Sequence, residues 1–266
     1  MRLTAIVLAA DRAPDDPLVA KAGVRCKALV PVAGRPMLLR VLDALEASPF
    51  VGERIVCGRS DLLLSQNAEL SRLVKGNEVR WVEAGATPCT SALAAFSGIS
   101  PDRPVLLTTA DHALLTPGIV EDFCRKALTT GCDAAAALMR ADEVISAFPA
   151  VRRTVLRMKD GGYCTCNLFA FLTPQGRLAV DFWKRVERER KRPVRVAYSL
   201  GIWAVLRYLA GFMTLEEAML RLSRAMRIRA CAVLMEDPRS AVDVDKAADW
   251  ELAEEILKNK TTHPCR

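Results

Sequence analysis

The stretch LTAIVLAADRAPDDPLVAKAGVRCKALVPVAGRPMLLRVLDALEA, residues 3–47, decides the fold. It begins with a short β-rich run, continues through a long loop, and ends in a helical pattern that starts at Pro36. Proline in the first turn of a helix loses no hydrogen bond, and Gly34 before it can adopt a turn conformation that is closed to other residues. This stretch therefore predicts a strand, a long loop and a helix, in that order.

The same alternation continues through the first half of the chain. Further β-rich runs occur at 54–59, 79–84 and 103–112, and helical patterns, one of them over 62–74, separate them. Continuous apolar strands that alternate with helices are typical of βαβ units, whose parallel sheet is buried on both faces. We therefore predict an α/β, doubly wound fold with a mainly parallel sheet.

After residue 140 this alternation stops. The run RRTVLRMKDGGYCTCNLFAFLT predicts a hairpin over about 150–173, with its turn at Asp160, Gly161 and Gly162. Glycine beside aspartate is a strong turn signal, because glycine adopts backbone angles that other residues avoid. The second half therefore begins with a hairpin instead of another βαβ unit.

Two helices are expected after the hairpin, over 175–192 and over about 194–226. They form a helical insertion of about 175–226 in what we predict to be a single domain spanning residues 1–266. A strand in IRACAVLM and a closing helix complete the chain, and Asp245 is a candidate N-cap of that helix.

The charge of the chain favours anionic ligands. The formal net charge is +7 and the pI is about 9.0, so the surface attracts phosphates. The densest basic run, WKRVERERKRPVR at 183–195, interleaves Glu187 and Glu189 with its cations. This mixture is typical of a solvated helix face and not of a nucleic-acid patch. We expect no nucleic-acid partner.

The cysteines indicate a reducing compartment. Nine cysteines occur at irregular spacings without paired CxxC units, and the N-terminus lacks the cleavage pattern of a signal peptide. We therefore expect a reduced, cytoplasmic protein. Cys164 and Cys166 can share one face of a strand, but no second pair or nearby histidine completes a zinc site.

The longest apolar stretch, LGIWAVLRYLAGFM at 200–213, is shorter than a membrane span and contains Arg207. We predict no transmembrane segment. The stretch is either a core helix, which is the commoner case, or an amphipathic surface that meets a lipid-like substrate or a membrane face. Peripheral membrane contact is therefore left open.

Candidate metal ligands follow from the sheet. In an open parallel sheet, ligands bind beyond the carboxyl ends of the strands. Three stretches lie at such positions: Ala9–Arg12, Glu83–Ser91 and Thr108–His112. Asp111, at the tip of a buried strand, offers the oxygen ligand that Mg²⁺ prefers. Asp243 and Asp245, two residues apart on a strand end, are expected to project the same way and could complete the metal site, although helix capping is an alternative role for either.

The long first loop ends at Lys27. A lysine at this point can reach the phosphates of a nucleotide that lies on the backbone N–H groups of the loop. A surface lysine is an equally good interpretation of this residue by itself. The loop contains neither the GxxxxGK[ST] of a Walker loop nor the GxGxxG of a dinucleotide site.

Five motifs resemble, in their order, the MobA-like NTP-transferase family of nucleotidyltransferases: VLAA…KALVPVAGRPMLLRVLDAL, EAGATPCTSALAA, LLTTADHALLTP, KDGGYCTCNLFAF and DVDKAADWELAEEI. The resemblance spans nearly the whole chain. It implies a Rossmann-like fold of the GT-A type and a Mg²⁺-dependent enzyme. The implied reaction transfers a nucleoside monophosphate from an NTP to a phosphorylated sugar, alcohol or cofactor, and releases pyrophosphate.

The resemblance also implies which residues bind the nucleotide. The first loop would hold the triphosphate through Leu8, Ala9, Ala10, Asp11, Arg12 and Lys27. The loop after the third strand would meet the base and ribose, through Gly85 and Ser91. CTP is the first choice of nucleotide and GTP the second, on resemblance alone.

The same resemblance implies the metal and acceptor residues. Asp111 matches a metal ligand of the family, Asp245 is the best match for the second acid, and Asp243 is the alternative. Lys27 and Asp111 would carry the catalysis. Gly162 and Asn167 would face the acceptor.

The first loop departs from the family pattern LAAGxGxRxG, because acids and prolines replace the glycines. The backbone N–H groups of Asp11 and Arg12 can still point at phosphate, whereas Pro14 has none. Acids near a triphosphate weaken its binding, so we expect Asp15 and Asp16 to point outward. We interpret the loop as a divergent phosphate loop.

The implied chemistry needs no protein nucleophile, because the acceptor phosphate attacks the α-phosphorus directly. The sequence agrees with this, since its only histidines are His112 and His263, and we expect His112 to support Asp111. Two alternatives stay open: a nucleotide-binding module without turnover, and a glycosyltransferase that uses a nucleotide-sugar donor.

Overall fold

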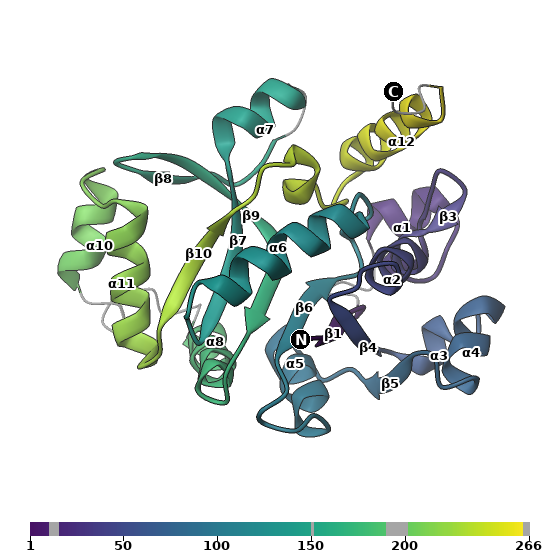
Figure 1. Ribbon diagram of the computed structural model, residues 1–266. Helices are drawn as coiled ribbons and strands as arrows, with labels where there is room; N and C mark the ends of the chain where they lie inside the picture. Colours follow the sequence, from purple (N-terminus) through teal and green to yellow (C-terminus); the bar gives the residue numbers. More distant parts are fainter. Residues whose placement is uncertain (11–15, 150–151, 190–201, 263–266) are drawn as a thin grey trace.

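The computed structural model describes residues 1–10, 16–149, 152–189 and 202–262 of the 266-residue chain. Its main feature is an eight-stranded sheet (Figure 1), in the order β10-β7-β9-β6-β1-β4-β5 with β8 paired to β9. The strands are β1 (Leu3–Leu8), β4 (Val51–Gly58), β5 (Arg80–Glu83), β6 (Val105–Thr109), β7 (Ala134–Arg140), β8 (Leu156–Met158), β9 (Gly161–Phe171) and β10 (Ala230–Leu234).

The sheet is mainly parallel, which confirms the predicted fold class. Strand β1 pairs in parallel with β4 and β6, β4 with β5, and β10 with β7. The exception is β9, which is antiparallel to β6, β7 and β8. This long strand lies between two parallel blocks and joins them into one sheet.

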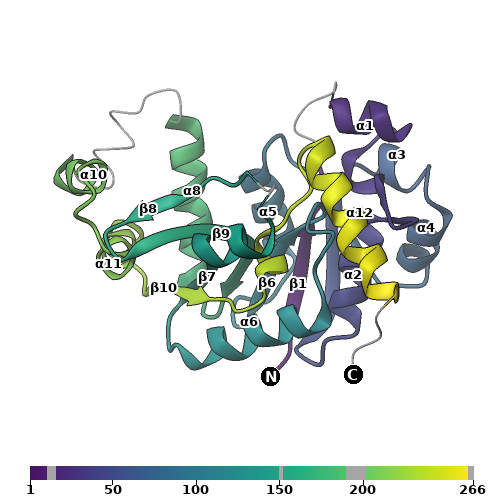
Figure 2. The same ribbon diagram turned by 90° about the horizontal axis from the view of Figure 1, so that it is seen from above.

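Helices cover both faces of the sheet (Figure 2), with α2 and α6 on one face and α5 and α8 on the other. The helices of the described residues are α1 (Pro17–Ala22), α2 (Met37–Glu46), α3 (Ser60–Leu63), α4 (Ala68–Lys75), α5 (Pro88–Ser97), α6 (Pro117–Thr129), α7 (Ala141–Ala147), α8 (Leu178–Glu189), α10 (Ile202–Leu209), α11 (Leu215–Met226) and α12 (Ala247–Thr262). Short 3-10 helices are η1 (Lys27–Leu29), η2 (Gln175–Arg177) and η3 (Pro238–Ala241), and β2 (Pro31–Val32) pairs with β3 (Arg35–Pro36).

The buried strands explain the apolar runs of the sequence. In β1, Ile6 packs in the cluster that contains α5 and α8, and its neighbour Val7 packs in the cluster that contains α2 and α6. Successive side chains of a strand point to opposite faces, so a strand covered on both faces must be apolar throughout. The turn before α2 also matches its prediction, since Gly34 has a positive φ of 76°.

In a third apolar cluster, the C-terminal helix packs against the segment that follows β1. This cluster joins α1, α12 and the loop after β6, and Val244 lies fully buried in it. The indole N–H of Trp250 donates to the Pro31 carbonyl at 2.6 Å. The C-terminal helix is thereby packed against the segment that follows β1, beside the carboxyl end of β6.

Two predicted helices are each divided into two. The prediction over 62–74 is wrong at its centre, because Asn67 accepts a hydrogen bond from the N–H of Leu70 and begins α4. The prediction over about 194–226 is wrong between α10 and α11, where Gly211 has a φ of 73° and Thr214 starts a capping box. The part of this prediction over 194–201 lies outside the described residues.

The hairpin predicted over about 150–173 is formed by β8 and β9, but its turn is Lys159–Asp160. Gly161 and Gly162 already belong to β9, so the turn was placed too far along the chain. A Cβ on Gly162 would lie 2.8 Å from a methyl group of Val155, which explains the need for glycine there.

The cysteines depart in part from the expectation of a reduced protein. Cys132, in the loop just before β7, and Cys231 on β10 form a disulfide. Five other described cysteines are outside any disulfide and are thiols: Cys57, Cys89, Cys124, Cys164 and Cys166. The prediction of reduced cysteines is therefore wrong for one pair. No helix among the described residues is long and apolar enough to cross a membrane.

Candidate active site

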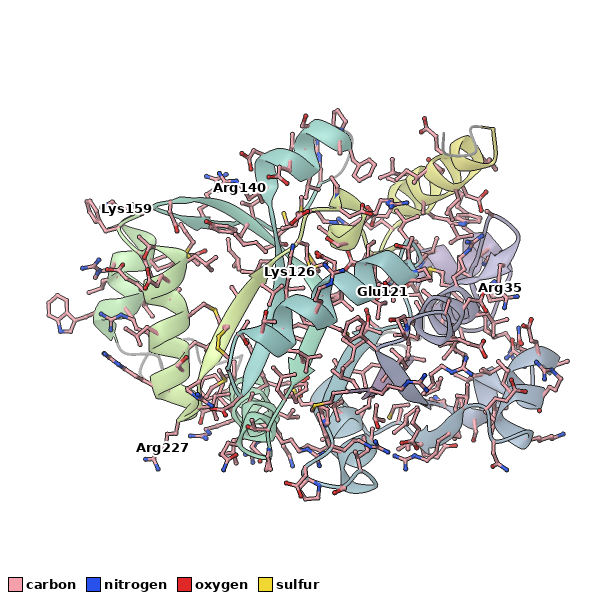
Figure 3. All side chains as sticks on the ribbon, viewed as in Figure 1. Arg35, Glu121, Lys126, Arg140, Lys159 and Arg227 are labelled. Atoms are coloured by element: carbon pink, nitrogen blue, oxygen red, sulfur yellow. A yellow bond between two sulfur atoms is a disulfide. The ribbon has the colours of Figure 1, made fainter. Side chains whose placement is uncertain are left out.

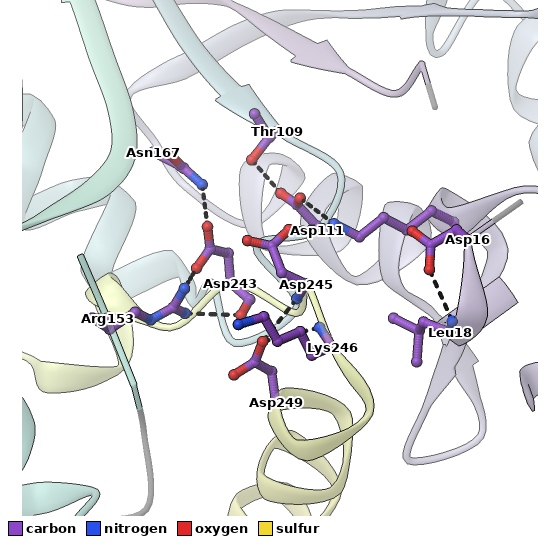
Figure 4. A network of polar contacts seen from close by, with 11 residues as sticks. Asp16, Leu18, Thr109, Asp111, Arg153, Asn167, Asp243, Asp245, Lys246 and Asp249 are labelled. Carbon is purple, nitrogen blue, oxygen red and sulfur yellow. Dashed lines mark hydrogen bonds and ion pairs between the residues drawn. The ribbon is translucent and has the colours of Figure 1, made fainter. Parts of the chain in front are cut away.

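Lys27 belongs to a polar network beyond the carboxyl end of β6. Figure 4 shows Thr109, Asp111, Asp243 and Asp245 of this network. Lys27 begins η1, and the neighbouring Ala28 and Leu29 are buried, which fixes the backbone from which its side chain extends. Its Nζ donates to Asp111 Oδ2 at 2.9 Å and to Asp245 Oδ1 at 2.5 Å. Three residues that the sequence proposed separately therefore meet at one ammonium group.

The charge of Lys27 is stabilised by its partners. Burial by itself would lower the pKa of this lysine, but the carboxylates of Asp111 and Asp245 outweigh burial and raise the pKa. Lys27 is therefore a cation at neutral pH. The Lys27 side chain is mostly buried and lies between two carboxylates. The alternative interpretation, a freely solvated surface lysine, is therefore wrong.

Asp111 is held in place from three directions. The hydroxyl of Thr109 donates to its Oδ1 at 2.6 Å, Lys27 donates to Oδ2, and the backbone N–H of Val244 donates to its carbonyl at 2.9 Å. Burial would raise the pKa of Asp111, yet Lys27 and Thr109 together bring it below its usual value. This carboxylate is ionised at neutral pH, as a metal ligand must be.

Asp243 and Asp245 flank the buried Val244 and reach the same network, but they have different partners. The prediction that they lie on a strand end is wrong, because residues 242–245 form an extended loop between η3 and α12. Asp245 is half exposed and bonds to Lys27. Asp243 is mostly buried and accepts a hydrogen bond from the side-chain amide of Asn167 at 2.8 Å.

Arg153 is the functional candidate that the sequence reasoning missed. Its guanidinium forms an ion pair with the Asp243 carboxylate and also donates to the Asp243 backbone carbonyl at 2.8 Å. Its Nε is buried and has no hydrogen-bond partner among the described residues. The only sequence signal was an arginine pair at 152–153 just before the hairpin, and nothing local distinguishes Arg153 from Arg152.

Asn167 reaches Asp243 through an unusual backbone conformation. Its φ is 48°, in the left-handed region, and the register between β7 and β9 shifts beside it, between Ala136 and Leu138. Asparagine tolerates this region better than most residues do. This register shift and backbone conformation turn the side-chain amide of Asn167 away from the sheet and toward Asp243.

Asp245 does not cap α12, although the sequence allowed it that role. The carboxylate of Asp249, one turn into the helix, accepts from the backbone N–H groups of Asp245 and Lys246 at 3.1 and 3.0 Å. An acid in the first turn can reach back in this way to the N–H groups just before a helix, as in a capping box. The Asp245 side chain bonds to Lys27 instead.

The predicted nucleotide residues lie at the same edge of the sheet. The carbonyl of Leu8 accepts from Ala110, and the N–H of Ala9 donates to Cys57, so the start of the first loop lies between β4 and β6. Ala10 is exposed there. Asp11 and Arg12 lie outside the described residues, as does Asp15. Asp16 is described, and its carboxylate caps α1 by accepting from the N–H of Leu18 at 2.8 Å.

Gly85, in the loop after β5, and Ser91, near the start of α5, are bonded to each other. The N–H of Gly85 donates to the Ser91 hydroxyl oxygen at 3.0 Å, and a Cβ on Gly85 would lie 2.5 Å from the Thr90 hydroxyl. Ser91 is itself buried. The serine therefore shapes the loop after β5 from inside, and contact of this loop with a base and ribose stays a prediction.

Of the two acceptor-side candidates, only Asn167 joins the network. Gly162 packs against Val155 and Ala141, and no described contact connects it to Lys27 or to the aspartates. No hydrogen bond joins the His112 ring to Asp111 in the part of the chain that the structure describes, so the support that His112 gives Asp111 there is electrostatic. Complete burial lowers the pKa of His112 to about 4, so it is neutral at physiological pH.

The donor set fits a hard divalent cation. Asp111 and Asp245 already converge on one positive charge, and both are oxygen ligands of the kind that Mg²⁺ binds with water and phosphate. Within the residues that the structure describes, no three His, Cys, Asp or Glu side chains form a ready metal cage. This also fits Mg²⁺, which usually takes one or two carboxylates and completes its shell with substrate.

Comparison with known proteins finds a family and solved structures that are similar to this chain. The family model described as MobA-like NTP transferase domain matches residues 5–227, which is most of the chain. A solved structure described as a hypothetical transferase from Thermus thermophilus is 28% identical with a TM-score of 0.77, and the match covers 94% of this chain and 100% of that one. No curated protein matches this chain.

Two more distant structures share the fold. A 4-diphosphocytidyl-2C-methyl-D-erythritol synthase from Anaerococcus prevotii is 15% identical with a TM-score of 0.57, and 97% of this chain and 96% of that chain are covered. A CMP:2-keto-3-deoxy-manno-octonic acid synthetase complexed with CTP is 12% identical with a TM-score of 0.58, and 98% and 100% are covered. At these identities the likeness establishes the architecture of the sheet and its helices.

Proposed function

This chain belongs to the MobA-like NTP transferase family of nucleotidyltransferases, and from that premise we propose that it transfers a nucleoside monophosphate from an NTP to a phosphorylated small molecule. The acceptor class is a sugar, alcohol or cofactor phosphate. The observation that carries the proposal is the meeting of Lys27 with Asp111 and Asp245 beyond the carboxyl end of β6, where an open α/β sheet binds its ligand.

The reaction is an in-line displacement at phosphorus. An oxygen of the acceptor phosphate forms a bond to the α-phosphorus, the bond from that phosphorus to the β-bridging oxygen breaks, and pyrophosphate leaves with the electron pair. No proton has to be removed from an ionised acceptor phosphate, so the site needs no general base. The buried and neutral His112 agrees with this requirement.

Charge is what the site must supply. Mg²⁺, when bound, neutralises the phosphate oxygens on which negative charge accumulates. In this proposal Asp111 and Asp245 hold the metal, and the Lys27 ammonium leaves these carboxylates for the triphosphate. Asp243 stays paired with Arg153 and Asn167, so it is less suitable than Asp245 as a metal ligand.

CTP is the first choice of nucleotide and GTP the second. The support for CTP is that one distant neighbour is described as complexed with CTP and another as a diphosphocytidyl synthase. Asn167 and Gly162 on β9 are the proposed acceptor side, since β9 borders the network. We place the reaction in the cytoplasm, where NTPs are made.

The test is pyrophosphate release. The protein is mixed with Mg²⁺, each of the four NTPs in turn, and a panel of phosphorylated sugars and alcohols, and pyrophosphate is measured by a coupled enzyme. Release that needs both an NTP and one acceptor is expected. NTP binding without release from any acceptor would favour a module without turnover, and release of nucleoside diphosphate from a sugar nucleotide would favour a glycosyltransferase.

A further inference from the structure

Helix α10 turns large apolar side chains toward the solvent. Trp203, Leu206 and Leu209 follow one another at intervals of three residues, which places them on one side of the helix. They are 74%, 48% and 73% exposed, and Phe212 in the turn that follows is 63% exposed. Large apolar side chains gathered on one exposed face mark an interaction surface. The expectation that this stretch is core is wrong for Trp203 and Leu206.

The exposed face lies at an extremity of the molecule. In both ribbon views α10 is at the end opposite to α3 and α4 (Figures 1 and 2). None of the three described apolar clusters contains a residue of α10. The helix is attached through the buried Ala204 and Met213, and through the ion pair of Arg207 with Glu217 on α11. Its outer side chains therefore contribute little to the core.

Cations lie on the elements next to this apolar face, together with Glu216 and Glu217 at the start of α11. Arg207 lies on α10 itself, and the exposed Arg224 and Arg227 lie on α11 and at its C-terminal end. Lys159, in the turn between β8 and β9, is exposed, and its backbone N–H donates to the carbonyl of Met213 at 2.8 Å. Figure 3 shows Lys159 and Arg227 above and below the pair of helices at this end of the molecule.

We propose that the face formed by Trp203, Leu206, Leu209 and Phe212 docks on an anionic lipid bilayer. An interfacial helix inserts tryptophan and leucine side chains between the lipid headgroups while arginines and lysines contact anionic headgroups. The face of α10 has both features. It is also a protruding helix and not a groove, which suits a flat and deformable surface.

A second copy of the chain is the main alternative, and charge disfavours it. A twofold interface places the same patch of each copy against the other, so the arginines of α10 and α11 would meet their own copies. The net charge of +7 adds to this repulsion between chains, whereas the same charge attracts an anionic bilayer.

Vesicle binding by the full chain tests this proposal without any need for turnover, so its failure and a failure of the proposed reaction can be told apart. The protein is sedimented with vesicles of phosphatidylcholine alone and of phosphatidylcholine with about 30% phosphatidylglycerol. We expect binding to the anionic vesicles only, and its loss when NaCl rises from about 0.1 M to about 0.5 M.

The double variant Trp203→Ser, Leu209→Ser should bind anionic vesicles at least about tenfold more weakly, because it removes apolar area that would enter the bilayer. Its melting temperature should stay close to that of the parent. Ile145→Ser, which changes a similarly exposed residue on α7, is the matched control and should bind as the parent does. Equal vesicle binding by the double variant and the parent would overturn the proposal.

A second measurement keeps the proposal testable if the double variant does not fold. Brominated lipids quench tryptophan fluorescence within the bilayer, so they should quench the parent more strongly than Trp203→Phe. Equal quenching of the two proteins would overturn the proposal. Absence of binding of the parent to anionic vesicles would also overturn the proposal. If the parent then forms a dimer and the double variant does not, the face belongs to an interface with a second copy.

Discussion

Lys27 and Asp111 are 84 residues apart in the chain, and their side chains meet at 2.9 Å between Nζ and Oδ2. The same ammonium bonds to Asp245. A positive charge thus lies between the two carboxylates that are proposed to bind a metal. Lysine and Mg²⁺ are therefore competitors at this site until a triphosphate gives the lysine another partner.

Lys27→Ala should bind Mg²⁺ alone about tenfold more tightly than the parent, because it removes a competing positive charge near Asp111 and Asp245. The same variant should bind NTP about ten- to hundredfold more weakly, since one charge-assisted phosphate contact contributes about 1.5–3 kcal/mol. Isothermal titration calorimetry measures both affinities. Lys21→Ala, which breaks an exposed ion pair with Glu251, is the control. Unchanged affinities for both ligands would remove Lys27 from the site.

Asp111→Asn should fold normally but should lose at least about a hundredfold in Mg²⁺-dependent turnover, because a neutral amide is a poor ligand for this ion. The pyrophosphate assay gives the rate, and thermal melting gives the stability. Asp61→Asn, which alters an exposed pair with Arg59, should keep the parent rate. Near-normal turnover by Asp111→Asn would show that Asp111 is not a metal ligand.

Arg153→Ala should lower the free energy of unfolding by about 3–5 kcal/mol, because it leaves the Asp243 carboxylate buried without its cation. Adding Asp243→Asn should restore part of the loss, since the unpaired charge is then gone. Urea unfolding of the four proteins of this cycle measures the coupling. Arg152→Ala is the matched control, because that side chain is exposed. Strictly additive losses would contradict a dependence of Asp243 on Arg153.

The stability of the protein should fall in mild acid because of His112. Burial lowers its pKa from the ordinary value of 6.5 to about 4, so the unfolded chain takes up the proton first. This contribution is fully present above pH 6.5 and is lost as the pH falls toward 4. The free energy of unfolding should therefore decrease by up to about 1.4 kcal/mol per pH unit in that window.

His112→Asn should flatten this dependence, whatever its effect on stability at neutral pH. Urea unfolding at several pH values between about 4.5 and 7 compares the two slopes. The difference between the two slopes belongs to the histidine together with its electrostatic effect on Asp111 and Asp237. Parallel slopes would contradict a neutral, buried His112.

The sheet and part of the site could be predicted because they depend on local pattern. Strands covered on both faces are apolar throughout, and the residues that follow them gather at one edge, so the amino-acid sequence alone places Lys27 and Asp111 near each other. Arg153 could not be found in this way. It pairs with Asp243 across 90 residues, and its neighbour Arg152 has the same chemistry.

The exposure of α10 was beyond sequence reasoning for a different reason. An apolar run indicates that side chains avoid water, but it does not say whether the chain itself or another surface covers them. Likewise, the division between α10 and α11 depends on Gly211 adopting a left-handed conformation, which a glycine inside a helical pattern permits without requiring.

Strand β9 connects the turn next to α10 with the candidate active site, so its length sets the separation between them. The strand begins at Gly161, beside the turn in which the backbone N–H of Lys159 donates to the carbonyl of Met213, just after α10. Further along the strand, the side-chain amide of Asn167 donates to Asp243. Six steps of an extended strand span about 20 Å. If α10 rests on a bilayer, an acceptor anchored there has to extend past this length of β9, about 20 Å, to bring its phosphate to Asn167. A shorter acceptor would not reach the site, so the length of the strand would select acceptors by their own length.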